Sequence, residues 1–371
     1  MIPVFDPVIS EDEIEMVVDA LRTGQVSGTF GHYITDFEQE FAGYVGCKHG
    51  IAVNSGTSAL HLAVAAAEIG KGDEVLVSAS TNIATALAAL HNGAVPVPVD
   101  AEPDTWNLDL DHLESLITPK TKAIIPVHLY GHPVDMDRLM EIARAHDLVV
   151  IEDCAESHGA TVRGRMTGSF GDMACFSFYA NKIITTGEGG MITTNDDALA
   201  ERLRLLRNLA FTEPRFRHEV AGFNFRMPAF VAALGLAQTR KIEMIVENKR
   251  RMAAAYNERL KDVPGLQLPV EKDWAKNVYW MYGVVVKPEF GIDRNALTEA
   301  LAERGIQTRT FFCPMNQQPV LQGLDGWREV PCPVADELWE QGLYLPSSWN
   351  LDEETIDTIC DAIRQAPDWD N

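Results

Sequence analysis

Short apolar runs alternate with amphipathic, helix-like segments through the first half of this 371-residue chain. Strands that are apolar along their whole length are buried on both faces, so the alternation predicts an α/β fold. We expect a mixed, mostly parallel sheet flanked by helices. The strands are expected at 50–53, 74–78, 95–99, 122–127, 148–152, 173–178 and 190–194, and the helices at 11–22, 35–45, 83–91, 108–117 and 135–146, with a further helix after 54–58.

Two further features organise the chain. Thr35, with Glu38 three residues later, has the spacing of a capping box at the start of a helix. After about residue 235 the alternation gives way to a long charged helical stretch, 236–261. Strands near 279–286 and helices near 295–304 and 352–365 follow. We therefore expect a large domain over residues 1–240 and a smaller α+β domain over 241–371.

Charge and apolar content exclude several classes of function. The net charge of −23 argues against nucleic acid or an anionic membrane surface as a partner. The chain has no apolar run long enough to span a membrane, and its first residues do not resemble a signal peptide, so a cytoplasmic location is expected. The six cysteines are scattered without a CxxC pair, which is typical of reduced thiols and predicts no metal site.

Four polar sites fall at the ends of expected strands, where ligands bind in such sheets. They are the turn 54–58 (Asn-Ser-Gly-Thr-Ser), Asp153, Ser177 and Lys182. Each site has an ordinary structural explanation when it is taken alone. The turn can be a helix cap, the acid and the hydroxyl can simply end a strand, and the lysine can be solvated.

Taken together, the four sites match the needs of pyridoxal 5′-phosphate (PLP). An acid keeps the pyridine nitrogen protonated, a lysine forms the Schiff base and carries protons, and a helix start with a glycine cradles the phosphate. A lysine that is desolvated between an apolar strand and the glycine-rich turn 187–190 also becomes nucleophilic. The sequence therefore predicts PLP as the cofactor and Lys182 as the catalytic residue.

The same residues carry a resemblance to a known family. The chain resembles the DegT/DnrJ/EryC1/StrS sugar aminotransferases, a fold-type-I PLP group. The matching stretches are NSGTSALHLA (54–63), PVHLYG (126–131), IEDCAESHGA (151–160), FSFYANKIITTGEGGMITTND (176–196), GFNFRM (222–227) and LYLPSSWNL (343–351). They span nearly the whole chain in order.

The resemblance implies roles for individual residues. Lys182 would be the Schiff-base lysine, Asp153 would face the pyridine nitrogen, and Glu156 would approach the ring hydroxyl. Asn224 would reach the phosphate of the neighbouring subunit's cofactor, which implies a homodimer with shared active sites. The loop 26–31 and the segment 309–313 would lie near the substrate. The remaining expected contacts are Ser55, Gly56, Thr57 and Ser177 with the cofactor phosphate, Asn82 with the cofactor, and Ser27, His128, Arg226 and Arg309 with the substrate.

Three positions depart from the family's pattern. Asn82 stands where an aromatic residue usually stacks on the pyridine ring. Pro228 and Cys313 stand where similar enzymes often have Thr and His. The sequence leaves open which group covers the cofactor ring in place of an aromatic residue.

The resemblance implies a transamination with L-glutamate as the amino donor and pyridoxamine phosphate as the intermediate cofactor form. The favoured substrate is GDP-4-keto-6-deoxy-D-mannose, which would give GDP-perosamine for surface polysaccharide, such as lipopolysaccharide O-antigen, or another glycoconjugate. A dTDP- or UDP-linked 3- or 4-keto sugar is the alternative. A non-catalytic regulator on the same fold is a second alternative. Lys182 argues against a related sugar dehydratase, because those enzymes carry His at this position.

Overall fold

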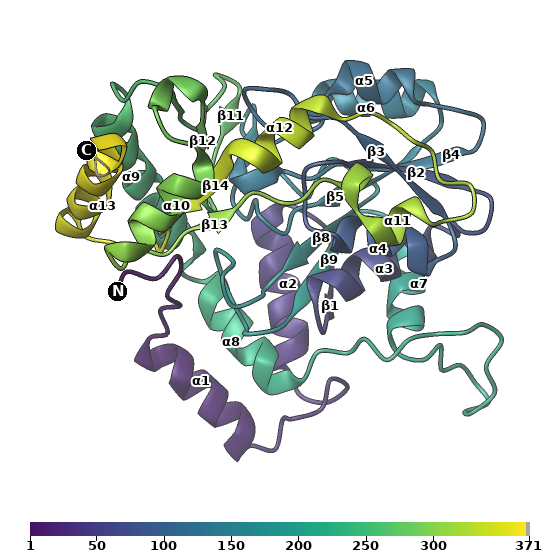
Figure 1. The fold of residues 1–371 in the computed structure, drawn as a ribbon. Helices are drawn as coiled ribbons and strands as arrows, with labels where there is room; N and C mark the ends of the chain where they lie inside the picture. Colours follow the sequence, from purple (N-terminus) through teal and green to yellow (C-terminus); the bar gives the residue numbers. More distant parts are fainter. Residues whose placement is uncertain (369–371) are drawn as a thin grey trace.

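The computed structural model describes residues 1–368 and centres on a seven-stranded sheet (Figure 1). The strand order is β1-β9-β8-β5-β4-β2-β3. The pairs from β8 through β3 are parallel, whereas β9 is antiparallel to both β8 and β1. The predicted mixed, mostly parallel sheet is therefore confirmed. Its strands are β1 His49–Val53, β2 Glu74–Ser78, β3 Val95–Val99, β4 Thr121–Ile125, β5 Val149–Asp153, β8 Met173–Ser177 and β9 Gly190–Thr194.

Helices cover both faces of this sheet, because successive strand side chains enter two different cores. Ile151 belongs to the core under α3, α4 and α7, while its neighbour Val150 belongs to the core under α2, α6 and α8. Three strands of this sheet, β2, β8 and β9, are buried at every position, which explains their continuous apolar sequence. The helices are α1 Glu11–Arg22, α2 Tyr33–Val45, α3 Gly56–Ala66, α4 Ala84–His91, α5 Leu110–Ser115, α6 Met136–Ala145, α7 Asp197–Arg207 and α8 Ala229–Thr239.

The C-terminal part builds a second, antiparallel sheet with the order β10-β12-β14-β13 and its own hydrophobic core. A three-stranded sheet joins the two parts of the chain, because β11 pairs with β6. The elements here are α9 Ile242–Leu260, α10 Arg294–Glu303, α11 Pro319–Gln322, α12 Pro333–Gln341 and α13 Glu353–Gln365, with β6 Thr161–Val162, β7 Arg165–Met166, β10 Leu266–Gln267, β11 Ala275–Lys276, β12 Tyr282–Val286, β13 Arg309–Thr310 and β14 Gly342–Leu345.

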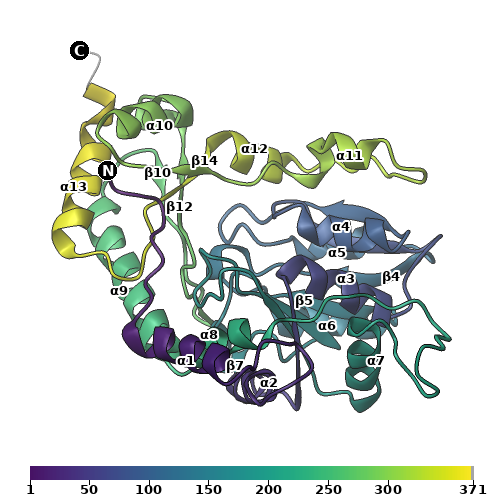
Figure 2. The same cartoon turned by 90° about the horizontal axis from the view of Figure 1, so that it is seen from below.

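One stretch of the C-terminal part, residues 311–332, returns to the large sheet and is called here the crossover segment. Figure 2 shows it with α11 leaving the small sheet on the side where α4 lies. Met315 N–H donates to Ala79 O at 3.0 Å, and Arg328 pairs with Glu74 at 3.0 Å. The predicted boundary at residue 240 falls in the break between α8 and α9. The division into two domains stays a prediction.

One local expectation is wrong. The helix α2 begins at Tyr33, and Glu38 is used elsewhere, so Thr35 does not begin a capping box. The capping box lies at α1, where the side chains and amides of Ser10 and Glu13 bond reciprocally. The helical stretch expected at 236–261 comprises the end of α8 and the whole of α9, with a break near Lys241. Within residues 1–368, no helix has both the length and the apolar character needed to cross a membrane.

Candidate active site

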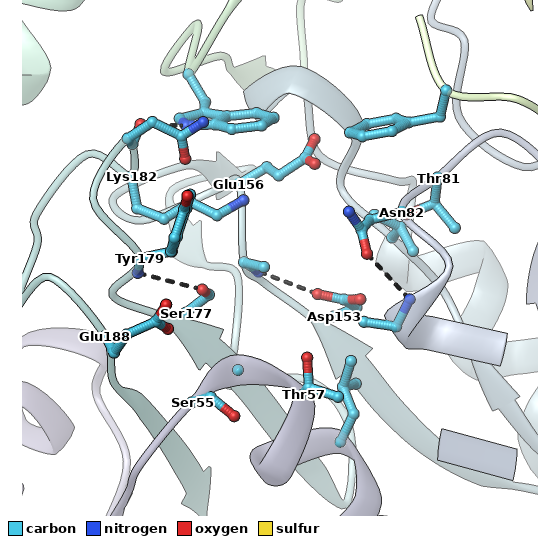
Figure 3. A pocket seen from close by; sticks show the side chains of 18 of the residues that line it. Ser55, Thr57, Thr81, Asn82, Asp153, Glu156, Ser177, Tyr179, Lys182 and Glu188 are labelled. Atoms are coloured by element: carbon cyan, nitrogen blue, oxygen red, sulfur yellow. Dashed lines mark hydrogen bonds between the residues drawn. The ribbon is translucent and has the colours of Figure 1, made fainter. Parts of the chain in front are cut away.

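A cavity of about 300 Å³ opens at the carboxyl ends of β5 and β8 (Figure 3). Asp153 is the last residue of β5, and Ser177 is the last residue of β8. The N-terminus of α3 and the loop before α4 form its other walls within the large sheet region. Parallel strands and helix starts meet at this edge, so the polar groups predicted from separate stretches of sequence face one cavity.

One end of the cavity is built to hold an anion. Ser55 caps α3 by accepting a bond from Ser58 N–H at 3.0 Å, while the amides of Gly56 and Thr57 have no acceptor within the helix. A Cβ added to Gly56 would lie 2.6 Å from the Cβ of Ser177, so only glycine allows this approach. Figure 3 shows Ser55, Thr57 and Ser177 gathered at this end.

Asp153 lies deeper in the cavity with its carboxylate fixed. It accepts hydrogen bonds from Thr85 Oγ1 at 2.8 Å and from Ala155 N–H at 3.1 Å. Burial raises the pKa of Asp153, while these two bonds and the charge on Lys182 act in the opposite direction. The carboxylate is thus desolvated and rigid, which suits a partner that is itself positively charged.

The amine of Lys182 faces the same cavity, where Figure 3 shows it and Glu156 extending into one space. Its Nζ lies 3.8 Å from the ring centroid of Trp280. Burial lowers the pKa of Lys182, and the nearby carboxyls of Glu156 and Asp153 raise it. The lowered pKa increases the fraction of neutral, nucleophilic amine.

Glu156 is buried beside this amine and is held by the backbone. Its Oε2 accepts a hydrogen bond from Tyr130 N–H at 2.7 Å. Burial raises the pKa of Glu156 to about 7, although the charge on Lys182 and the bond from Tyr130 oppose this shift. Glu156 can therefore hold a proton near neutral pH.

Asn82 lines the cavity but does not present a flat ring to it. Its Oδ1 accepts a bond from Ala84 N–H at 3.0 Å, which shapes the start of α4. The aromatic surface comes instead from Tyr179 and from three residues in the C-terminal part of the chain, Trp280, Phe312 and Tyr344. Sequence reasoning missed these three residues, because they follow no strand-end pattern and come from separate loops and strands.

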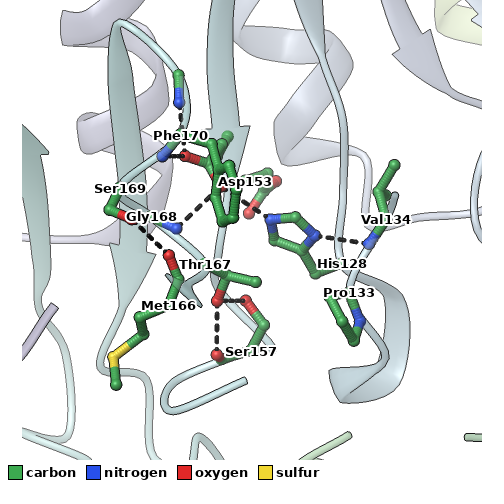
Figure 4. A network of polar contacts seen from close by, with 12 residues as sticks. His128, Pro133, Val134, Asp153, Ser157, Met166, Thr167, Gly168, Ser169 and Phe170 are labelled. Atoms are coloured by element: carbon green, nitrogen blue, oxygen red, sulfur yellow. Dashed lines mark hydrogen bonds and ion pairs between the residues drawn. The ribbon is translucent and has the colours of Figure 1, made fainter. Parts of the chain in front are cut away.

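The expectation that His128 contacts the substrate is wrong in this structure. The side chain is fully buried and does not line the cavity. Val134 N–H donates to its Nδ1 at 3.0 Å, and its Nε2 lies 3.2 Å from Glu152 Oε2 (Figure 4). Both ring nitrogens are thus used inside the protein.

Glu152 and its neighbours brace the strand that carries Asp153. The Glu152 carboxylate accepts bonds from the amides of Gly168, Phe170 and Gly171, each at 2.8 Å. Cys154 also lies close enough to His128 and Glu152 to suggest a metal site. The hydrogen bonds already occupy the carboxylate and the imidazole, so this cluster is an internal polar network that fixes the end of β5.

The other residues expected to contact the substrate or a partner do not line the cavity of Lys182 in the single chain. Arg226 lines a second cavity of about 390 Å³ with residues 28–31 of the expected substrate loop, and its Nη1 donates to Asn208 Oδ1 at 2.7 Å. Ser27 bonds locally to Thr29, and Asn224 is exposed. Arg309 is exposed on β13, opposite Tyr344.

The cavity around Lys182 fits a phosphorylated aromatic aldehyde such as PLP. Three distinct groups line this one cavity. They are the anion cradle at α3, formed by Gly56, Thr57 and Ser177, the fixed carboxylate of Asp153, and the amine of Lys182. The buried Oδ1 of Asn181 has no hydrogen-bond partner within the protein, although its residue lines this cavity. A bound ligand would satisfy it.

Comparison with known proteins agrees with this geometry. The sequence profile of the DegT/DnrJ/EryC1/StrS aminotransferase family matches residues 7–364. The chain is 43% identical over 366 residues to a GDP-perosamine synthase of Caulobacter vibrioides and 38% identical over 365 residues to one of Escherichia coli O157:H7, covering 98% of each chain in both cases. The crystal structure of Streptomyces venezuelae DesV in complex with a ketimine intermediate matches with a TM-score of 0.89 and 37% identity, over 95% of this chain and 93% of that chain. This chain belongs to the DegT/DnrJ/EryC1/StrS aminotransferase family.

Proposed function

We propose that this aminotransferase uses L-glutamate to convert GDP-4-keto-6-deoxy-D-mannose into GDP-perosamine. The observation that carries the reaction class is one cavity that unites the amine of Lys182, the carboxylate of Asp153 and the anion cradle at α3. The sugar and nucleotide are inferred from the similarity to two GDP-perosamine synthases over almost the full chain. The product would serve surface polysaccharide or other glycoconjugate synthesis.

The cofactor is PLP, which supplies an electron-withdrawing ring when it is bound. The amides of Gly56 and Thr57 and the hydroxyl of Ser177 would hold its phosphate, and Lys182 would hold it covalently. Asp153 would keep the ring nitrogen protonated through its charge.

Proton transfer belongs to Lys182. When it is not bonded to the cofactor, its amine would be free to take the proton from the α-carbon of the amino donor. Its lowered pKa favours the neutral form that this step requires. Glu156, with a pKa of about 7, can hold a proton beside it. Trp280 and Phe312 line the cavity with aromatic surface and exclude water from the reacting atoms.

The proposal includes a homodimer with shared active sites. Asn224 is expected to contact the cofactor phosphate and Arg226 the substrate, yet neither residue lines the Lys182 cavity of its own chain. In a dimer, both side chains would instead reach into the active site of the neighbouring subunit. The proposed cytoplasmic location is supported by the cysteines, all six of which are unpaired thiols.

A substrate panel tests the proposal. Purified enzyme with PLP and glutamate would be offered GDP-, dTDP- and UDP-linked keto sugars, with products identified by mass spectrometry and NMR. We expect amination of the GDP-linked 4-keto sugar. Amination of a dTDP- or UDP-linked sugar alone would replace the substrate assignment and leave the reaction class intact. A regulator would show no change in the visible absorbance of bound PLP on addition of glutamate.

A further inference from the structure

Lys249, on α9, is a fully buried lysine whose amine contacts two backbone carbonyls. Its exposure is 2%. The Nζ donates to the carbonyl oxygen of Trp280 at 2.6 Å and to that of Ser347. Burial lowers the pKa of Lys249 to about 7. A neutral amine still carries two N–H groups, so one remains available for each carbonyl after deprotonation.

The two carbonyls face each other where a β-ladder ends. Tyr282 pairs with Leu345 at the end of the β12–β14 ladder. Trp280 is two residues before Tyr282 and Ser347 is two residues after Leu345, so both lie just beyond the ladder. The backbones no longer pair here. Tyr282 N–H donates instead to the side-chain hydroxyl of Ser347, at 2.9 Å. Lys249 therefore ties together two chain segments that the sheet itself no longer joins.

One of these segments carries the ring that contacts the catalytic amine. The face of the Trp280 ring lies 3.8 Å from Lys182 Nζ, measured to the ring centroid. The Trp280 Nε1–H donates to the carbonyl of Asn181 at 2.7 Å, which fixes the outer edge of the indole. Lys249 fixes the other end of the same residue through its backbone.

We propose that Lys249 is a positioning residue for the transamination. By holding the backbone of Trp280, it keeps the indole face against the amine of Lys182. This inference rests on the proposed role of Lys182 as the cofactor lysine. An aromatic face stabilises a nearby cation, so a displaced indole would favour the neutral form of the nitrogen that Lys182 contributes.

The test uses the PLP-loaded enzyme with Lys249→Met, which keeps an unbranched side chain one heavy atom shorter and removes its donors. The pH midpoint of the visible cofactor absorbance should fall by about half a unit or more, and kcat should fall at least about fivefold. Glu156 and Asp153, the charged groups that face Lys182, are unchanged in this variant. If Lys249→Met fails to fold, Lys249→Gln keeps an NH₂ donor group on a shorter side chain and should give a smaller shift in the same direction.

Tyr256→Phe is the matched control, because Tyr256 lies on the same helix and its hydroxyl donates to Pro346 O at 2.9 Å. It removes a buried bond next to Ser347 without touching Trp280, and should lower stability while leaving the midpoint at the wild-type value. An equal shift in Tyr256→Phe would reduce Lys249 to a general structural role and overturn the proposal.

A double-mutant cycle identifies the route of the effect. Trp280→Ala should itself lower the midpoint, and adding Lys249→Met to it should cause no further shift. Additive shifts, or a wild-type midpoint in Lys249→Met, would contradict the inference. A wild-type enzyme that shows no visible cofactor band would instead contradict the role of Lys182 and hence the proposed function.

Discussion

The nitrogen of Lys182 is controlled by opposing influences in a small space. Burial disfavours its charge, whereas Glu156, Asp153 and the Trp280 ring favour it. This balance gives a lysine that can be neutral for attack and charged after it has taken a proton. A surface lysine lacks the first property, and a lysine in a strong salt bridge lacks the second.

Replacing Lys182 by Ala should abolish turnover while the protein still folds, because the side chain makes no bond on which the fold depends. The expected loss in kcat is at least about a thousandfold, since both covalent attachment and proton transfer disappear. Steady-state assays with glutamate and the keto sugar would measure it, and circular dichroism would check the fold. Wild-type turnover in Lys182→Ala would rule out the assignment.

The raised pKa of Glu156 predicts how the free energy of unfolding depends on pH. Its pKa is raised from 4.5 to about 7, so between these values the folded protein holds a proton that the unfolded chain releases. The free energy of unfolding contributed by this group is therefore present below pH 4.5 and is lost as the pH rises to 7. Glu156→Gln should flatten the fall in the free energy of unfolding over this pH window, because the amide does not titrate. Urea denaturation at several pH values would measure it, and an unchanged slope would contradict the shift.

The cradle makes a prediction about cofactor affinity. Gly56→Ala places a Cβ 2.6 Å from the Cβ of Ser177, so one of the two must move. We expect PLP binding to weaken about tenfold, equivalent to about 1.4 kcal/mol. Gly43→Ala is the control, because an added Cβ there has no neighbour within 4 Å. Equal affinities of the two variants for PLP, measured by fluorescence titration, would show that the cradle does not depend on Gly56.

Most residues predicted to hold the cofactor share one cavity, whereas those predicted to contact the substrate do not line it, and this difference has a physical reason. Ser55, Asp153 and Ser177 terminate or follow strands, and parallel strand ends converge wherever the sheet forms. The position of His128 depends on how its loop packs against Glu152, and hydrophobic periodicity carries no information on that. The aromatic residues of the cavity depend on how the C-terminal part docks, which is equally hidden in the pattern.

Among the elements, the strand predictions agree with the structure within about two residues, since buried strands leave a continuous apolar signature. The break within the helical stretch expected at 236–261 has no local signal, because neither Gly nor Pro interrupts the sequence between Thr239 and Ile242. The helix start predicted at Thr35 failed because Glu38 has a stronger partner in tertiary structure.

That partner is Arg207 of α7, which bonds Glu38 of α2 at 2.5 Å, while Glu38 also accepts from Ala52 N–H of β1 at 2.8 Å. Both charged side chains are largely buried. Glu38→Ala should lower the free energy of unfolding by about 3 kcal/mol, because it leaves the amide of Ala52 without its acceptor and the largely buried guanidinium of Arg207 without its carboxylate, with only the carbonyl of Ala52 still accepting from it. Chemical denaturation would measure this loss.

The exposed pair of Arg364 and Asp361 is the control for that measurement. Asp361→Ala should change stability by less than about 0.5 kcal/mol, because solvent already screens the interaction. If Glu38→Ala costs no more than Asp361→Ala, the buried pair does not join these three elements energetically.

For the whole molecule, shared active sites can be tested by mixing variants. Lys182→Ala and Asn224→Ala should each be inactive alone, and subunit exchange between them should restore about a quarter of wild-type activity, because half of the dimers are hybrids with one intact site. Lys182→Ala mixed with Asp153→Ala should restore none, since both residues line the same cavity of one chain. No recovery in the first mixture would contradict the shared-site dimer.

The aromatic wall of the cavity has a consequence for biosynthesis of the protein itself. Lys182, Asp153 and the cradle leave the ribosome well before Trp280, and Tyr344 follows later still. A nascent chain can therefore assemble the phosphate site early, yet its reactive amine stays open to water and to cellular aldehydes until Trp280 and Tyr344 have been synthesised. Protection of the amine is thus coupled to synthesis of residues far along the chain from the vitamin-binding groups.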